Sequence, residues 1–369
     1  MSSQLKVNAI SDAAGANGNA ITLATDGTCT AKITNNLSNR NLIINGAMQV
    51  AQRGTTSTSA GYQTLDRWTS SMAGTDEACT FAQADVTAGT DPWKAGFRKA
   101  FKVTNGNQTS GAGAADDLSV TQNIEAQNLS NSGWDYTSSS SYITLSFWAK
   151  SSVAQTFYTG IRIYGDDQRE YCFAYTLAAN TWKKVTHSIP GGSGHTILNT
   201  NALGAFIQWP LWWGTNYTSS GRAVDTWQIK NNAANYPDNT STWYTTNDAT
   251  FEITGVQLEV GDVATDFEHR SYQDELQRCR RYFYKWNKTG SNRYTYSGGY
   301  SSHNNSAFID ITFDPEMRAA PSAGSFSDAN VTSASFATLN PECALYIATA
   351  TQSDAAGRIS TAVDFSAEL

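Results

Sequence analysis

Short runs of alternating apolar and polar residues fill most of the chain between residues 41 and 270. In SYITLSFWAKSS, Ile143, Leu145, Phe147 and Ala149 fall on one side of an extended strand, and the intervening residues fall on the other. Clusters of Gly, Asn, Asp and Ser separate such runs, which is typical of turns between short strands. The pattern predicts strands in ACTFAQADV, RKAFKVTN, LSVTQNI, SYITLSFWAKSS, TFYTGIRIYG, EYCFAYTLA, TWKKVTHSI, LGAFIQWPLWW and ATFEITGVQLEV.

Regular short strands with almost no helical periodicity favour an all-β sandwich, of which the jelly roll is the common large version. We therefore expect a jelly-roll β-sandwich over residues 41–270. The next segment, SYQDELQRCRRYFYKW, differs: Ser271 is a candidate N-cap with Asp274 three residues later. Its apolar residues recur at helical spacing, at Tyr272, Leu276, Cys279 and Phe283. This predicts a linking helix of three or four turns within residues 271–285.

The sequence pattern predicts folded structure less clearly at the two ends of the chain than in residues 41–285. Residues 1–40 contain small and turn-forming residues but no aromatic residue, so they can hardly form a core of their own. Such a segment is either a flexible tail or is ordered against another subunit or a sister chain. Residues 286–369 return to short strands with few large aliphatic side chains, which predicts a small C-terminal β domain. Small β units often need oligomer partners for stability, and we expect a homotrimer.

The charge of the chain excludes some partners. The net charge is −7, and no run of Lys and Arg occurs. Nucleic acid is therefore a poor partner, because neutralised phosphates supply most non-specific affinity. An anionic membrane surface is disfavoured for the same reason. No apolar run approaches the roughly 20 residues of a membrane-spanning helix, so we expect no membrane insertion.

The sequence contains no recognisable motif of catalytic residues. The four histidines are isolated, and the metalloprotease, nucleophile-elbow, phosphate-loop and dinucleotide-binding motifs are missing. Carboxylates could form a glycosidase pair, but Asp166 and Asp167 fit a solvated turn between strands. For Glu252 and Glu259, which lie in or beside a strand, ion pairing ranks first, a bound Ca²⁺ second and catalysis third. We therefore predict no enzymatic activity and no cofactor, with a structural Ca²⁺ left open. The carboxylates considered are Asp166, Asp167, Glu170, Glu252, Glu259 and Asp262.

The tripeptide Asp66-Arg67-Trp68 follows a polar loop. In an extended segment, Asp66 and Trp68 share one face and Arg67 points to the other. A catalytic role would need a partner acid or base that the sequence does not display. We expect a structural role, with Trp68 in the core and Arg67 or Asp66 in a buried or interfacial ion pair.

Residues 206–244 have the highest density of aromatic side chains, mixed with Asn, Thr, Ser and Asp. Aromatic rings cover the apolar faces of sugars, while amides and carboxylates meet the hydroxyl groups, so the segment predicts a glycan-binding surface. The alternative for any single tryptophan is a place in the core, and for the whole stretch we expect at least one exposed ring. The candidate residues are Trp209, Trp212, Trp213, Tyr217, Trp227, Tyr236, Trp243 and Tyr244.

Several segments, in this order, resemble a family of virion fibre proteins of tailed bacteriophages. They are NLIINGAMQVAQRG, GYQTLDRW, YITLSFWAKSS, TWKKVTHSIPG, FEITGVQLEVGDVATDFEHRSYQDELQRCRRYF and FDPEMRAAPS. The opening MSSQLKVNAISDAAG is similar to the part of such fibres that attaches to the particle. The stretch VQLEVGDVATDFEHRSYQDEL is the most specific, and residues 199–250 carry no motif of the family.

The resemblance implies a jelly roll similar to carbohydrate-binding modules, a homotrimer, and a role in attachment to host glycans. It also implies attachment of residues 1–40 to other virion proteins, most simply in the tail. A capsid decoration or head fibre is the alternative. A tailspike depolymerase fits less well, because those enzymes are usually β-helices with stacked repeats and this chain shows none.

Overall fold

The computed structural model describes residues 9–11, 19–23, 29–31, 39–286, 300–301, 306–329, 331–350, 358–359 and 363–369. Most of the segment 1–40 lies outside these residues, as do parts of the C-terminal range 286–369. The described part of the N-terminal segment forms a three-stranded antiparallel sheet of β1 (Ala9–Ser11), β2 (Asn19–Leu23) and β3 (Cys29–Ala31).

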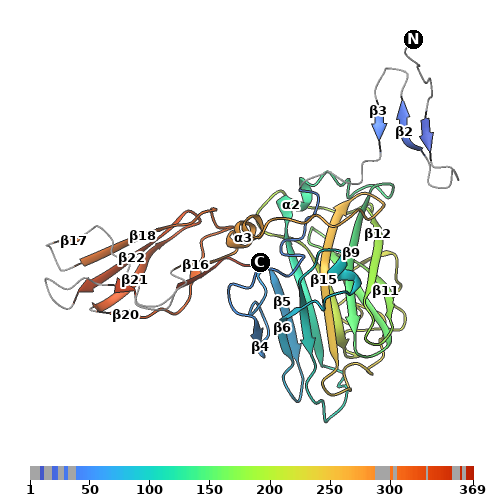
Figure 1. Cartoon of the computed structure of the whole chain (residues 1–369), viewed down its shortest axis with the longest axis horizontal. Helices are drawn as coiled ribbons and strands as arrows, with labels where there is room; N and C mark the ends of the chain where they lie inside the picture. Colours follow the sequence, from blue (N-terminus) through green and yellow to red (C-terminus); the bar gives the residue numbers. More distant parts are fainter. Residues whose placement is uncertain are drawn as a thin grey trace.

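Two six-stranded antiparallel sheets form a jelly-roll β-sandwich, which confirms the predicted fold class (Figure 1). The first sheet contains, in spatial order, β14 (Trp227–Ile229), β11 (Arg169–Leu177), β10 (Gln155–Ile163), β13 (Leu203–Trp213), β8 (Asp117–Glu125) and β5 (Trp68–Ala73). The second contains β12 (Lys183–Pro190), β9 (Tyr142–Ser151), β15 (Thr250–Val260), β7 (Lys99–Thr104), β6 (Thr80–Asp85) and β4 (Thr56–Ser57). All nine predicted strands are present.

The core lies between the two sheets. Ile143, Leu145, Phe147 and Ala149 are each 0% exposed, which confirms the alternation predicted for β9. Facing strands supply further large side chains, so the sheets are held together mainly by burial of apolar and aromatic surface.

Helix α3 (Tyr272–Arg280) follows the sandwich, and the Oγ atom of Ser271 accepts a hydrogen bond from the backbone N–H of Asp274 as predicted. The helix is shorter than expected, because the chain enters strand β16 at Phe283. Two short helices were not predicted, α1 (Asp91–Lys94) and α2 (Ala126–Ser130), since four or five residues are too few to show a helical period. No helix among the described residues is long and apolar enough to span a bilayer.

The C-terminal strands extend to one side of the sandwich, beyond α3 (Figure 1). A three-stranded sheet contains β16 (Phe283–Trp286), β24 (Val363–Ser366) and β19 (Ser322–Ala323). A four-stranded sheet contains β17 (Tyr300–Ser301), β18 (Ser306–Thr312), β22 (Cys343–Ala350) and β21 (Val331–Leu339), and β20 (Asp328–Ala329) pairs with β23 (Arg358–Ile359). This region has its own buried cluster, which includes Phe313, Tyr346 and Phe365, so its core is better filled than the sequence indicated.

Asp66, Arg67 and Trp68 lie where the sandwich meets the last described residues. Arg67 has a φ angle of 71°, so the segment is not extended, and the expectation that Asp66 and Trp68 share one face of a strand is wrong. Trp68 begins β5 and is buried in the core. The buried Arg67 guanidinium forms an ion pair with Glu368 and donates a hydrogen bond to the carbonyl oxygen of Asn123 at 2.7 Å. All three residues therefore occupy structural positions.

Further contacts stabilise the same junction between the sandwich and the C-terminal residues. The Arg67 guanidinium lies 3.5 Å from the centre of the Tyr282 ring, and Arg53 pairs with Glu368 at 3.0 Å. Arg281, directly after α3, pairs with the buried Glu125 of β8 at 2.9 Å. Buried charged groups therefore connect the sandwich to the C-terminal strands.

Asp66 is expected to make the stability of this junction depend on pH. Burial raises the pKa of its carboxyl to about 6, although hydrogen bonds from Gln52 and the charge of Arg53 act in the opposite direction. The pKa in an unfolded chain is about 3.9, so the folded protein binds this proton more tightly. The contribution of Asp66 to the unfolding free energy is therefore fully present below about pH 4 and is lost as the pH rises through 6, a change of about 3 kcal/mol.

Urea unfolding between pH 4 and 8 measures this effect in the wild-type protein and in Asp66→Asn. The variant should lack most of the decline between pH 4 and 6. Parallel curves for the two proteins would contradict the assignment.

Candidate functional site

The aromatic residues of segment 206–244 divide between the core and the surface. Five of the eight candidate rings are buried, those of Trp209, Trp212, Tyr236, Trp243 and Tyr244. Trp209 and Trp243 are 0% exposed, and the Trp212 ring stacks on Tyr244 with centroids 5.6 Å apart. The glycan-binding prediction is wrong for these five residues, because a ring enclosed by protein cannot cover a sugar.

The other three candidates, Trp213, Tyr217 and Trp227, are half-buried. Trp213 ends β13, and its ring centroid lies 5.8 Å from that of Tyr217 and 5.3 Å from that of the buried Tyr236. Trp227 begins β14 at the edge of the first sheet, where its ring packs against His195. The structure therefore brings Trp213 and Tyr217 together and places Trp227 three strands away, since β11 and β10 lie between β14 and β13.

A charged network fixes the outer face of the first sheet near these rings. The buried carboxylate of Glu170 accepts hydrogen bonds from Arg162 Nε at 2.6 Å and from Arg222 Nη2 at 3.1 Å. Arg162 Nη2 also donates to Asn235 Oδ1 at 2.9 Å, and the backbone N–H of Asn235 donates to the carbonyl oxygen of Tyr217 at 2.8 Å. Burial raises the pKa of the Glu170 carboxyl, and the two arginines limit the rise. The network thus holds the loop after β13, including Tyr217, against the sheet.

Two further rings on this face were missed by the sequence reasoning. Phe206 of β13 lies opposite Arg162 of β10, whose guanidinium carbon is 4.8 Å from the centre of the Phe206 ring. The half-buried Tyr164 ring lies 5.9 Å from the Phe206 ring. Alternation could have identified both, because Phe206 and Tyr164 follow the buried, inward-facing Ala205 and Ile163.

We call this region the Arg162 surface, defined by Arg162, Tyr164, Phe206, Trp213 and Tyr217, with the buried Asn235 holding Arg162 in position. Phe206 and Trp213 lie seven positions apart on β13, or about 23 Å at about 3.3 Å per residue. Aromatic side chains beside the fixed, part-exposed guanidinium of Arg162 can contact apolar and polar faces of one ligand at once. The arrangement suits an extended polar ligand that presents both kinds of face.

The carboxylates considered for catalysis form other contacts. Glu252 Oε1 pairs with Lys150 Nζ at 2.8 Å, and Glu259 Oε2 pairs with Arg40 Nε at 3.4 Å, which confirms ion pairing for these two. No group of three or more His, Cys, Asp or Glu residues that could hold a metal ion occurs within the described ranges. Glu170 is also ion-paired, with Arg162 and Arg222, and the remaining candidates are exposed between strands, namely Asp166, Asp167 and Asp262.

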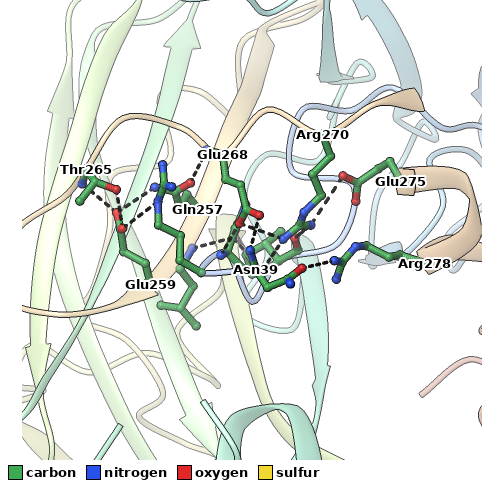
Figure 2. Close-up of polar contacts among 12 residues, drawn as sticks. Asn39, Gln257, Glu259, Thr265, Glu268, Arg270, Glu275 and Arg278 are labelled. Atoms are coloured by element: carbon green, nitrogen blue, oxygen red, sulfur yellow. Dashed lines mark hydrogen bonds and ion pairs between the residues drawn. The ribbon is translucent and has the colours of Figure 1, made fainter. Parts of the chain in front are cut away.

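A second polar network anchors the segment where residues 1–40 join the sandwich (Figure 2). Glu268 accepts hydrogen bonds from the backbone N–H groups of Asn39 at 2.6 Å and Asn41 at 2.8 Å. Arg270 donates to the carbonyl oxygen of Asn41 at 2.6 Å and pairs with Glu275 of α3 at 3.6 Å. Burial favours a raised pKa for Glu268, but the N–H of Asn41 and the charge of Arg270 outweigh it and lower the pKa.

This network explains part of the sequence pattern. Glu268, Arg270 and Glu275 all lie in VQLEVGDVATDFEHRSYQDEL, and Asn41 begins NLIINGAMQVAQRG. Two segments more than 200 residues apart are therefore complementary halves of one anchoring site.

Comparisons with known proteins found similarity to solved structures only. No family model matches the chain, and no curated protein matches it. A sugar-binding protein of Bacteroides thetaiotaomicron has 14% identity and a TM-score of 0.32, and the match covers 60% of this chain and 100% of that one. The cellulose-binding domain of Cellulomonas fimi β-1,4-glucanase C has 15% identity and a TM-score of 0.27, with coverage of 58% and 99%. A family 16 carbohydrate-binding module has 11% identity and a TM-score of 0.28, with coverage of 59% and 99%. Because all these TM-scores lie below 0.5, the architecture described above rests on the strand order of this chain alone.

Proposed function

We propose that this chain is a non-catalytic fibre protein of a tailed-bacteriophage virion that binds glycan on the host surface. The observation that carries glycan binding is the Arg162 surface. Its rings offer apolar faces to sugar rings, and the part-exposed guanidinium of Arg162, already held in position by Glu170 and the buried Asn235, offers hydrogen bonds to hydroxyl groups. Pre-ordered side chains lose little conformational freedom on binding, which favours affinity.

The virion role rests on the resemblance of the sequence to tail fibres and on the anchoring network of Figure 2. In this proposal, residues 1–40 attach the protein to other tail proteins and contribute to a homotrimer. Native mass measurement should give three copies, and antibody labelling under the electron microscope should mark the tail. Labelling of the capsid would replace this assignment by that of a capsid decoration or head fibre.

Binding of the full-length protein to an array of bacterial surface polysaccharides tests the glycan-binding proposal. Phe206→Ala and Trp213→Ala should each weaken binding to the recognised glycan at least tenfold, about 1.4 kcal/mol, because each removes one sugar-facing ring. Tyr272→Ala is the matched control, since Tyr272 is 54% exposed on α3 and lies outside the Arg162 surface.

Binding to no polysaccharide, or equal losses in all three variants, would contradict the proposal. Repeating the measurement in EDTA distinguishes a surface formed by side chains alone from one that needs the Ca²⁺ considered above.

A further inference from the structure

Three half-buried tryptophans gather around the outer face of the second sheet, on the side of the sandwich opposite the Arg162 surface. Trp148 of β9 points outward, because its neighbours Phe147 and Ala149 are 0% exposed and fill the core. Trp182 directly precedes β12, and Trp93 lies in α1. Together with Phe267, these rings pack around a small buried cluster, so they are supported from below while part of each remains accessible.

Lysine side chains occupy neighbouring positions on the same face. Strand pairing places Lys184 of β12 next to Trp148. It also places Lys150 of β9 next to Glu252 of β15, and Glu252 next to Lys102 of β7. Lys150 Nζ lies 2.8 Å from Glu252 Oε1 and 5.1 Å from the centre of the Trp182 ring.

The charge of this face differs from that of the whole chain. Three lysines and one glutamate share these outward positions, whereas the chain carries a net charge of −7. Glu252 is engaged with Lys150, while Lys184 is exposed and Lys102 is half-buried. A ligand here meets a surplus of positive charge beside two aromatic rings.

We propose that this region, defined by Trp148, Trp182, Lys102, Lys150 and Lys184 and called the Trp148 surface, binds an acidic polysaccharide. The rings of Trp148 and Trp182 cover sugar faces, and the lysines pair with carboxylate or phosphate groups along the polymer. A neutral glycan would leave the lysines without a role. Nucleic acid is the less favoured polyanion, because three lysines neutralise few of its phosphates and neutralised phosphates supply most of its non-specific affinity.

The inference does not depend on the Arg162 surface. The two surfaces lie on opposite faces of the sandwich and share no residue, so loss of one leaves the other intact. If both operate, one protein can hold two polysaccharide chains at once, and avidity then depends on the spacing of the chains.

The test uses the full-length protein with polygalacturonate and polysialic acid as acidic probes, dextran as the neutral probe, and single-stranded DNA as a second polyanion. We expect binding to at least one acidic polysaccharide, no binding to dextran, and weaker binding as NaCl rises from 50 to 500 mM. Trp148→Ala should weaken binding at least tenfold, and Lys184→Gln about threefold with a smaller dependence on salt. Lys230→Gln and Tyr272→Ala are the matched controls, which lie outside this surface and should bind like the wild type.

Failure to bind either acidic polysaccharide would overturn the inference. It would also be overturned if DNA bound as tightly as the polysaccharides and Trp148→Ala had no effect, because the site would then be a general polyanion surface. If Trp148→Ala does not fold, Trp182→Ala and Lys184→Gln decide the matter, with melting temperature as the check on folding.

Discussion

Replacing Arg67 with alanine is expected to lower the free energy of unfolding by about 3–5 kcal/mol. The substitution leaves the carboxylate of Glu368 with Arg53 as its remaining cation and removes the donor to the Asn123 carbonyl oxygen. It also removes the guanidinium that lies 3.5 Å from the centre of the Tyr282 ring. Breaking a buried pair is costly because the remaining charge stays buried with less compensation than before. Urea unfolding followed by tryptophan fluorescence measures the change.

The exposed pair Lys99–Asp85 provides the matched control. Its N–O distance is 2.6 Å, but its side chains are 37% and 82% exposed. Solvent screens such a pair, so Lys99→Ala should cost less than about 1 kcal/mol. An Arg67→Ala protein as stable as Lys99→Ala would show that the junction does not depend on this guanidinium. The double variant Arg67→Met/Glu368→Leu should be less destabilised than the sum of its single variants, since no buried charge of this pair is left behind.

Trp209→Ala is expected to destabilise the sandwich by about 3–5 kcal/mol. The Trp209 ring is 0% exposed, and its centroid lies 5.5 Å from that of Trp68 and 5.6 Å from that of Phe147. Removing it opens a cavity between the two sheets that strands paired on both sides cannot close. The measurement is again the midpoint and slope of urea unfolding.

Trp213→Ala, four positions along the same strand, is the contrasting variant. Because its ring is half-buried on the outer face, the loss of stability should be about 1 kcal/mol, while glycan binding falls. Equal destabilisation by the two substitutions would contradict the inward and outward assignment of β13.

Features of the fold that depend on neighbouring residues could be predicted from the sequence, whereas contacts between distant residues could not. Alternation identified the strands, and the short-range signal of Ser271 identified the start of α3, because both depend on residues close in sequence. The buried partner of Arg67 lies 301 residues away, so no local pattern indicates it. The left-handed backbone at Arg67 also removed the strand geometry on which the expected side-chain directions depended.

The binding surfaces were harder to predict for the same reason. Aromatic density marked the correct segment but could not distinguish Trp209 from Trp213, because a bulge near Pro210 shifts the register of β13. The Trp148 surface combines side chains from β7, β9, β12 and β15, and these come together only once the strand order is known.

The anchoring of Asn39 and Asn41 also determines how the molecule would respond to a pulling force. The adjoining segment hydrogen-bonds to β15 through Leu42 N–H to Leu258 O at 2.9 Å and Val256 N–H to Gly46 O at 3.0 Å. β15 is an interior strand, flanked by β9 and β7. A load applied at the N-terminal end would therefore be carried by these backbone hydrogen bonds to β15 together with the contacts of Glu268 and Arg270. The same segment also contacts α3, through Asn39 to Arg278 and through Arg270 to Glu275, so a load on it would be shared between the sheet and the helix.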